Sequence, residues 1–338
     1  KALKTAQDNN DTWTELWAYS GIGDIYFDLG DSHNAIRSFE YYLDRATGLG
    51  SKTDRAIALN DIGRVYLEYK EDYDKAREYF LEALDLAVLT GYTLMEGVAT
   101  ANIGVVYSKK GSYKKALTYH DKGISIVRSL NNTYTEMQGL SEKGETLFQM
   151  EKYKEALECH LLSVELSESI GNNVEKWKYE LNAAKTYEGL EDVDNAIAYY
   201  KQSINTLSGI KKKIKSDALK QGFSDQERQI EVYKRLIDLL IKNNMAKEAF
   251  RYIEESKSKI IKDAFGDVKP IAYDEDLQNT LSQVDKIEKK KEAIERQLFE
   301  ERKKPKEEQD KTKIDILTNT LATTEGEFNQ WMLTLKFQ

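Results

Sequence analysis

Residues 104–116 read Gly-Val-Val-Tyr-Ser-Lys-Lys-Gly-Ser-Tyr-Lys-Lys-Ala, and this stretch contains the pattern that decides the fold. A small residue, Gly104, is followed three positions later by Tyr107 and twelve positions later by Ala116. The first five small residues of this kind lie 40 or 41 positions apart, and a period of this length is typical of a solenoid. The pattern recurs, fully or in part, at Gly23/Tyr26/Ala35, Gly63/Tyr66/Ala76, Gly144/Leu147/Ala156, Ala184/Tyr187/Ala196 and Ile237/Leu240/Ala249.

Each unit is predicted to be a pair of helices. Between Val98 and Val127, apolar residues recur three and four positions apart in two runs, which is the spacing of amphipathic helices. A turn separates the two runs, and Gly111 within it suits the left-handed backbone that ends many helices. Gly104 and Ala116 would let neighbouring helices approach closely, because larger side chains at these positions would hold them apart.

These residues resemble the tetratricopeptide repeat, whose signature is a small residue, an aromatic residue, an alanine and a second aromatic residue. The second aromatic position holds Phe39, Phe80 and Tyr200 in three units, and His120 and His160 in two others. The resemblance implies an all-α fold, with a right-handed tetratricopeptide superhelix of about six helix pairs followed by a long antiparallel helical hairpin. The long repeats are similar to those of bacterial signalling proteins and of the Leu-Gly-Asn repeat and kinesin light chain families. Such proteins bind peptide segments or partner domains in a concave groove lined by their first helices.

Composition and charge restrict the class of protein and of partner. The 338 residues include two prolines, 19 glycines, one cysteine and 32% charged residues, which suits long helices with solvated faces. No apolar run approaches the roughly 18 residues of a membrane helix, and one cysteine forms no internal disulfide, so we expect a soluble, cytoplasmic protein. The net charge is −10 before Lys211 and +2 from there onward. An acidic array favours a protein or peptide segment that is basic or mixed polar and apolar, and disfavours nucleic acid.

The repeat spacing changes after the fifth unit. The step from Ala184 to Ile237 is 53 residues and includes a lysine run at 211–215, which we interpret as a solvated helix end rather than a nucleic-acid patch. We predict a tetratricopeptide array over 1–210, a final divergent helix pair over 211–268 and a hairpin connector over 271–338. Pro305 separates the two apolar, coiled-coil-like seams of the hairpin. The seams contain Leu281, Val284, Ile287, Ile294 and Leu298, then Ile314, Leu317, Leu321, Phe328, Trp331 and Leu335.

Residues 225–265 carry a second resemblance. The stretch from Tyr233 to Phe265 is similar to the last helix pair before the peptidase in tetratricopeptide–CHAT proteins, where an alanine, an acidic residue, a serine and a lysine precede an apolar helix end. The resemblance implies that the hairpin connects the repeats to a caspase-like peptidase. That peptidase uses a histidine–cysteine dyad in a further domain, so we predict no enzymatic activity within residues 1–338.

Candidate catalytic and metal-binding residues are few. Cys159 and His160 are adjacent, but neighbouring residues of a helix point about 100° apart, so we interpret them as a packed structural pair. The three histidines lack zinc-ligand spacing, and no glycine-rich phosphate loop occurs. We therefore predict no catalytic residue, no metal and no cofactor.

The predicted partner-binding groove is formed by the first helices. On each of them, side chains one position after the small residue, and two, three and six before it, should face the concave side. Asparagine amides there can bind the N–H and C=O groups of an extended peptide, whereas Glu142 and Glu145 stand where a chaperone-binding domain needs basic residues. The predicted groove residues are Trp17, Ser20, Asp24, Ile57, Asn60, Asp61, Arg64, Val98, Asn102, Gln138, Glu142, Glu145, Lys178, Asn182 and Lys185.

Three functions stay open from the sequence. The first is the recognition and regulatory part of a tetratricopeptide–CHAT protease. The second is the sensor region of a bacterial signalling protein, either a histidine kinase or a transcription regulator. The third is a free-standing adaptor. All three require a scaffold that binds a protein segment.

Overall fold

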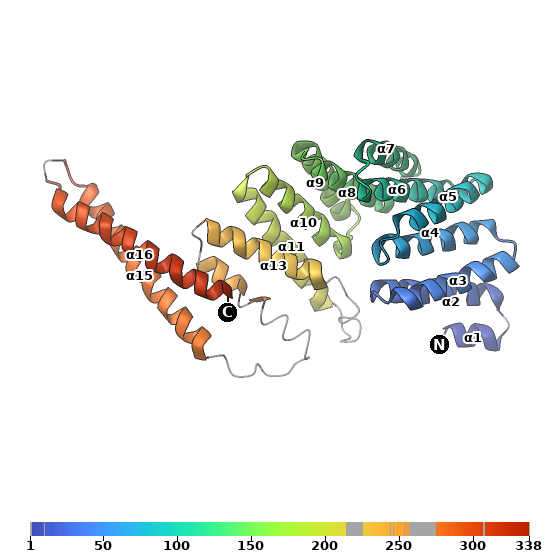
Figure 1. The fold of residues 1–338 in the computed structure, drawn as a ribbon, viewed down its shortest axis with the longest axis horizontal. Helices are drawn as coiled ribbons and strands as arrows, with labels where there is room; N and C mark the ends of the chain where they lie inside the picture. Colours follow the sequence, from blue (N-terminus) through green and yellow to red (C-terminus); the bar gives the residue numbers. More distant parts are fainter. Residues whose placement is uncertain are drawn as a thin grey trace. The chain divides into compact units, whose positions relative to one another are not determined.

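The computed structural model describes residues 2–9, 11–213, 226–243, 245, 247–253, 255–256, 275–306 and 308–337. These residues form α-helices joined by short turns, with no strand among them (Figure 1). No helix within these ranges is both long and apolar enough to cross a membrane. The chain divides into two compact units, residues 1–235 and 236–338. The predicted all-α fold is confirmed.

Five consecutive helix pairs make up most of the first unit. Each helix packs against the next one along the chain, and Figure 1 shows the pairs stacked in chain order. The short helix α1 (Ala2–Asp8) precedes the first pair, and α13 (Gln226–Lys242) begins in the first unit. The first helices are α2 (Thr12–Asp28), α4 (Lys52–Glu68), α6 (Thr93–Lys109), α8 (Thr133–Gln149) and α10 (Asn173–Gly189). The second helices are α3 (Ser32–Gly48), α5 (Tyr73–Thr90), α7 (Tyr113–Ser129), α9 (Tyr153–Ser169) and α11 (Val193–Lys213).

Polar caps and left-handed turns set the ends of these helices. At the start of α3, a side-chain oxygen of Asp31 accepts a hydrogen bond of 3.1 Å from the backbone N–H of Asn34, which is a typical N-cap. Just before it, Gly30 has a φ of 73°. Glu151 and Glu191 take the same left-handed backbone in the corresponding turns, with φ of 58° and 60°. The turn is therefore imposed by the repeat even where no glycine is present.

A contact between a glycine and a ring closes each of the first four helix pairs. A Cβ atom at Gly63 would lie only 2.7 Å from Cε1 of Phe80, and one at Gly104 only 2.9 Å from Nδ1 of His120. No side chain fits at these positions without moving the ring. The other three anchors, Gly23, Gly144 and Ala184, are buried as well. The prediction that the small residues lie at the contacts within the pairs is confirmed for the four glycines, and Ala184 is buried as predicted.

In two repeats, histidine replaces the buried phenylalanine or tyrosine of the second helix. The residue that contacts it from the next first helix differs as well. In the second repeat, Phe80 lies in one apolar cluster with Val106 of the next first helix. One repeat later the corresponding residues are His120 and Thr146, and Nε2 of His120 lies 3.1 Å from Oγ1 of Thr146. The hydroxyl gives one ring nitrogen a hydrogen-bond partner that valine would not supply.

His160 repeats this arrangement one unit further along. Its Nδ1 atom lies 3.0 Å from Oγ1 of Thr186. Burial lowers the pKa of both His120 and His160 to about 4, because a charged ring would lose its hydration. Both rings are therefore neutral at pH 7 and act as parts of the core.

The short helix α1 packs before α2 in the same way as the end of a second helix, such as α3, packs before the first helix that follows it. Ala6 on α1 and Ala46 on α3 lie the same number of positions before the small residue of the next first helix. Both side chains are buried. Part of α2 nevertheless stays open, since Ile25 is 60% exposed whereas Val65, at the corresponding position of α4, is fully buried. The first helix of the array thus exposes more apolar surface than the later ones.

The second unit contains an antiparallel hairpin of α15 (Glu275–Arg302) and α16 (Lys311–Phe337). Ion pairs flank its apolar seam, for example between Nζ of Lys291 and a carboxylate oxygen of Glu325, 3.1 Å apart. The predicted hairpin is confirmed. The seam includes the predicted residues Ile294, Leu298, Ile314, Leu317 and Leu321, and Phe328 is buried on α16.

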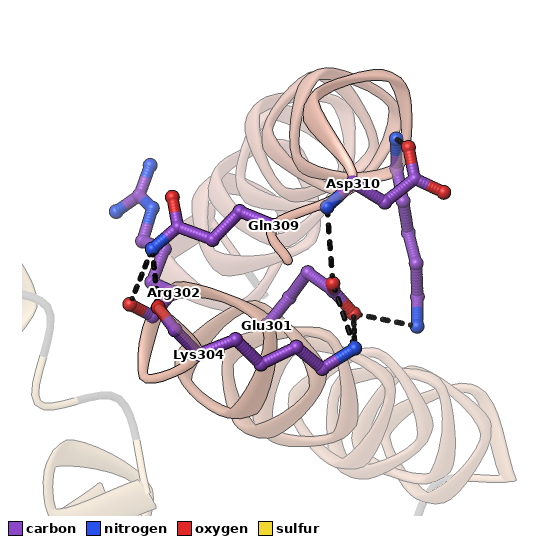
Figure 2. Close-up of polar contacts among 6 residues, drawn as sticks. Glu301, Arg302, Lys304, Gln309 and Asp310 are labelled. Carbon is purple, nitrogen blue, oxygen red and sulfur yellow. Dashed lines mark hydrogen bonds and ion pairs between the residues drawn. The ribbon is translucent and has the colours of Figure 1, made fainter. Parts of the chain in front are cut away.

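A single carboxylate holds the turn between α15 and α16, as Figure 2 shows. Glu301 is buried and accepts hydrogen bonds from Nζ of Lys304 (2.8 Å) and of Lys313 (3.0 Å), and from the backbone N–H of Asp310 (3.2 Å). These hydrogen bonds keep the pKa of Glu301 at about 2. Nε2 of Gln309 donates to the carbonyl of Lys304, 2.8 Å away, and closes the turn from the other side.

Part of the predicted organisation falls outside the described residues. The ranges 214–225 and 257–274 lie outside them, and with these the end of the lysine run and the apolar helix end at Phe265. The side chains of Leu281, Val284 and Leu335 lie outside them too. The domain boundaries predicted at 210 and at 268–271 stay predictions.

Replacing Gly104 by leucine should destabilise the array, because the new side chain must displace His120 or the carbonyl of Ala116, 3.2 Å from the Cβ position. Overpacking of this kind costs about 1–3 kcal/mol or more. Gly21→Leu is the matched control, since a Cβ atom at Gly21 meets nothing within 4 Å. Thermal unfolding followed by circular dichroism measures both variants. An unchanged melting temperature for Gly104→Leu would contradict the assigned contact.

Acid should weaken the third and fourth repeats through their histidines. Folding lowers the pKa of His120 and His160 from 6.5 to about 4, so the unfolded chain binds their protons more tightly. Their stabilising contribution is then fully present above pH 6.5 and is lost as the pH falls toward 4. The double variant His120→Phe with Thr146→Val copies the second repeat and should reduce this loss. Urea unfolding at pH 7 and pH 5 tests it, and an undiminished loss in the variant would exclude His120 as a cause.

Candidate functional site

A polar network joins α2, α4 and α6 on the surface formed by the first helices, here called the concave surface. Nδ2 of Asn102 on α6 donates to Oδ1 of Asn60 on α4, 2.8 Å away. Asn60 in turn lies 3.5 Å from Oδ1 of Asp61, and Arg64 lies 3.4 Å from the same oxygen. Arg64 also forms an ion pair of 3.9 Å with Asp24 on α2. The structure thus brings five predicted groove residues together.

Asp61 lies in the floor of this network and not on its free surface. It is 7% exposed, and Asn60 is 3% exposed. Desolvation raises the pKa of Asp61 to about 6, although the positive charge of Arg64 opposes the shift. Arg64 stacks over the ring of Phe27 at 4.4 Å, and its distance to Asp61 is long for a charge-assisted hydrogen bond. Asp61 is therefore a carboxylate whose charge the protein compensates poorly.

A second acidic cluster surrounds Glu142 on α8. Its side chain is accessible to solvent, but protein encloses it on several sides. This desolvation, together with the negative charges of Glu68 and Glu145, raises the pKa of Glu142 to about 7. Arg228 on α13 and Lys109 on α6 act in the opposite direction. Charged side chains from four helices therefore contribute to the electrostatic field at this point.

Charged residues also influence one another across the concave surface. Desolvation raises the pKa of Asp28 at the end of α2, while the positive charges of Arg64 and Lys178 oppose this. Lys178 lies on α10, four repeats further along the chain. Desolvation and the negative charge of Glu175 raise the pKa of Tyr134 on α8, and Arg64 opposes that shift. Charges of the first and the fifth repeat therefore act on each other across this surface.

The remaining predicted residues pair along or between helices. Nδ2 of Asn182 on α10 donates to Oγ of Ser141 on α8, 3.3 Å away, so the bridge between Asn60 and Asn102 has a counterpart. Nζ of Lys185 lies 3.8 Å from Glu231. The other contacts are Gln138 to Tyr134 (3.2 Å), Glu145 to Gln149 (2.9 Å), Lys178 to Glu175 (3.5 Å) and the ring of Trp17 to that of Trp13. Ile57 and Val98 pack against the apolar core, and Ser20 is half-buried.

Sequence reasoning missed several residues of this surface. Asp28 and Glu68 each lie one helical turn after a predicted groove residue, and Tyr134 lies one turn before another. Residues four apart share a face of a helix, so a rule extended by one turn would have found all three. Arg228 follows the fifth repeat, and only the tertiary structure brings it near Glu142.

The residues considered for catalysis lie in the core. Cys159 is buried, and desolvation raises the pKa of its thiol, which keeps it in the neutral and less reactive form. His160 faces Thr186 and not the thiol. Within the part of the chain that the structure describes, no three His, Cys, Asp or Glu residues form a group that could hold a metal ion.

Stacked helix pairs whose first helices share one concave surface define a helical-repeat interaction protein. Within that class, the chain contains tetratricopeptide repeats. A family model described as tetratricopeptide repeat matches residues 14–87 and 54–129, and a second model with the same description matches residues 181–206. The predicted repeats are confirmed at these positions. No curated protein matches the chain.

Solved structures share the fold at low sequence identity. A Rap protein complexed with competence and sporulation factor has a TM-score of 0.60 at 14% identity, with 97% of this chain and 80% of that chain covered. BtubC from P. vanneervenii has a TM-score of 0.51 at 14% identity, covering 64% and 90%. A STAND protein with a tetratricopeptide repeat sensor from Pyrococcus horikoshii has a TM-score of 0.51 at 16% identity, covering 76% and 38%. These likenesses establish the superhelical fold alone.

Asp61→Asn should stabilise the array at neutral pH, because folding raises the pKa of Asp61 from 3.8 to about 6 and so disfavours its charged form. A raised pKa means that stability is lost as the pH rises through this interval, so the advantage of asparagine should grow between pH 4 and pH 6. The expected gain at pH 7 is roughly 1–3 kcal/mol.

Asparagine already stands at the corresponding position as Asn102 on α6 and Asn182 on α10, so the fold accommodates it. The reverse change, Asn102→Asp, is the matched control and should destabilise the array. Urea unfolding at pH 4 and pH 7 measures both variants. An equal free energy of unfolding for Asp61→Asn and the original chain at pH 7 would contradict the effect.

Proposed function

We propose that the concave surface binds an extended segment of a partner protein, so that the chain acts as a protein–protein interaction scaffold. The observation that carries this proposal is that buried Asn60 and Ser141 hold the half-buried amides of Asn102 and Asn182 in place on the concave surface. An amide side chain offers a donor and an acceptor together, which matches the groups of an extended peptide backbone. Tetratricopeptide repeats support the same general role.

The charge of the concave surface favours a basic partner segment. Desolvation raises the pKa of Asp24, Asp28, Asp61 and Glu142, so the protein itself supplies too little positive charge near them. A lysine or arginine from a partner would stabilise the charged carboxylates. The net charge of −10 before Lys211 would also speed the approach of such a segment.

The larger protein in which this scaffold works is a further part of the proposal. We take it to be a tetratricopeptide–CHAT protease, with catalysis supplied by a domain outside residues 1–338. The similarity of residues 225–265 to the helix pair before such peptidases, and the hairpin that follows, support this assignment. The cytoplasmic location expected from the sequence belongs to the same proposal.

A second candidate is the sensor region of a bacterial signalling protein. The fold likeness to a STAND protein with a tetratricopeptide repeat sensor, and to a Rap protein complexed with a factor, favours it. The two candidates differ in the domain that the scaffold serves, a peptidase or a signalling output. The sequence that accompanies residues 1–338 in the native protein decides between them, and a protein without either domain would be a free-standing adaptor.

Selection of peptides from a random twelve-residue library displayed on phage, with the purified chain as bait, tests the scaffold function. We expect enriched peptides whose binding is lost in the double variant Asn60→Ala with Asn102→Ala. Asn319→Ala, on the exposed side of α16, is the control and should bind normally. The melting temperature of each variant shows whether a loss reflects unfolding. Failure of the folded, unaltered chain to enrich any peptide would overturn the proposal.

Reversing Glu142 and Glu145 to lysine should weaken binding of an enriched basic peptide at least about tenfold, because the cluster around Glu142 would change sign. The same reversal at Glu300 and Glu308, exposed in the hairpin unit, is the matched control. The effect should shrink between low and high salt. Fluorescence anisotropy measures the affinities. Equal losses from the two pairs of reversals would rule out the concave surface as the origin of the charge effect.

A further inference from the structure

Two tryptophans are exposed side by side on the first helix of the array. Trp17 is 62% exposed and Trp13 is 47% exposed. Their ring centroids lie 6.3 Å apart, with an angle of 47° between the ring planes. Residues four positions apart lie on the same face of a helix, so the two rings form one apolar platform. Tryptophan is highly buried on average in proteins and is enriched among residues that dominate binding energy.

The exposure of Trp17 is particular to α2. The positions that correspond to Trp17 in the other first helices are all more covered, and they hold smaller or polar side chains. These residues are Ile57, Val98, Gln138 and Lys178. The repeat architecture therefore does not require a tryptophan at this position.

Negative charge follows the platform on the same face of α2. Asp24 and Asp28 lie seven and eleven positions after Trp17, close to two and three turns of the helix. The range Thr12–Asp28 contains three acidic residues and no lysine or arginine. Asp24 pairs with Arg64 only at 3.9 Å, which is too long for a hydrogen bond. Its carboxylate thus keeps the capacity to bind another cation.

We propose that this face of α2 is a two-part docking site for a partner segment that carries a large apolar side chain and, nearby, a lysine or arginine. The apolar side chain packs on the platform of Trp13 and Trp17, and the cation pairs with Asp24 and Asp28. The proposal rests on the proposed function and adds to it the chemistry of the partner. Charge complementarity selects this occupant, because α2 is purely acidic and the whole region before Lys211 carries a net charge of −10.

The distance between the tryptophan platform and the acidic residues determines how far apart the apolar and the basic residue of the partner segment should be. Trp17 and Asp24 are seven residues apart, which is about 10 Å along a helix at 1.5 Å per residue. An extended peptide advances about 3.3 Å per residue. The apolar and the basic residue of the partner should therefore be about three positions apart, in either order along the chain.

Two synthetic peptides test this site directly. Both are fluorescein-labelled, have twelve residues of serine and glycine, and contain one phenylalanine and one arginine, either three or nine positions apart. Fluorescence anisotropy at constant salt measures their binding to the purified chain. We expect the closely spaced peptide to bind at least about tenfold more tightly, and Trp17→Ala or Asp24→Asn to remove that advantage. Leu89→Ala and Asp85→Asn, exposed on the second helix α5, are matched controls and should have no effect.

Each other outcome overturns the inference and leaves a distinct conclusion. If library-selected peptides bind but neither Trp17→Ala nor Asp24→Asn affects the closely spaced peptide, the scaffold function stands and the two-part site is wrong. If light scattering shows a dimer that Trp17→Ala dissociates, the platform is a contact between copies of the chain. If no peptide of either kind binds, the proposed function fails together with this inference. Melting temperatures of all variants exclude unfolding as the cause of a loss.

Discussion

The contact between a small residue on one helix and a ring on the next is the constraint on which the rest of this structure depends. The ring of Phe80 lies so close to the backbone of Gly63 that a Cβ atom would sit 2.7 Å from it. This contact fixes the separation within a pair and leaves the other faces of each helix free to stack on neighbours. Because the first four pairs repeat the contact, their first helices line one surface. The bridge between Asn60 and Asn102 exists only because α4 and α6 are held at this spacing.

On the concave surface, the acidic residues that favour the proposed binding of a basic segment also reduce the stability of the fold. Asp61 is nearly buried with only long contacts to Arg64 and Asn60, and its raised pKa shows that the fold disfavours its charge. A residue that served stability alone would be the asparagine found at the same position on α6. Destabilising, poorly compensated groups tend to gather where a ligand completes the interactions. The poorly compensated carboxylates therefore support the proposed binding of a basic segment, at a cost to the stability of the isolated protein.

The core residues differ between repeats of this array. In the central repeats, the replacement of one pair of core residues by another affects only the neighbouring helices. Phenylalanine with valine in the second repeat becomes histidine with threonine in the third and fourth. Each ring keeps a partner only if the next first helix carries the hydroxyl, so His120 and Thr146 must change together. In a solenoid each repeat touches only its neighbours, so such an exchange does not disturb the rest of the stack. The lowered pKa values of the two histidines predict that these repeats are sensitive to acid.

The sequence by itself determined the helix pairs, the turns and the contacts of the small residues, because each depends on residues a few positions apart or one repeat apart. The periodic pattern of Gly104, Tyr107 and Ala116 is sufficient to place them, and it also predicts which face of each first helix should form the groove. The tertiary structure alone decided which groove residues meet. It placed Asp28 near Lys178 and Glu68 near Glu142, and it buried Asp61 while leaving Trp17 exposed. The physical reason is the superhelical turn, since small rotations between neighbouring pairs accumulate over several repeats and no local pattern records their sum.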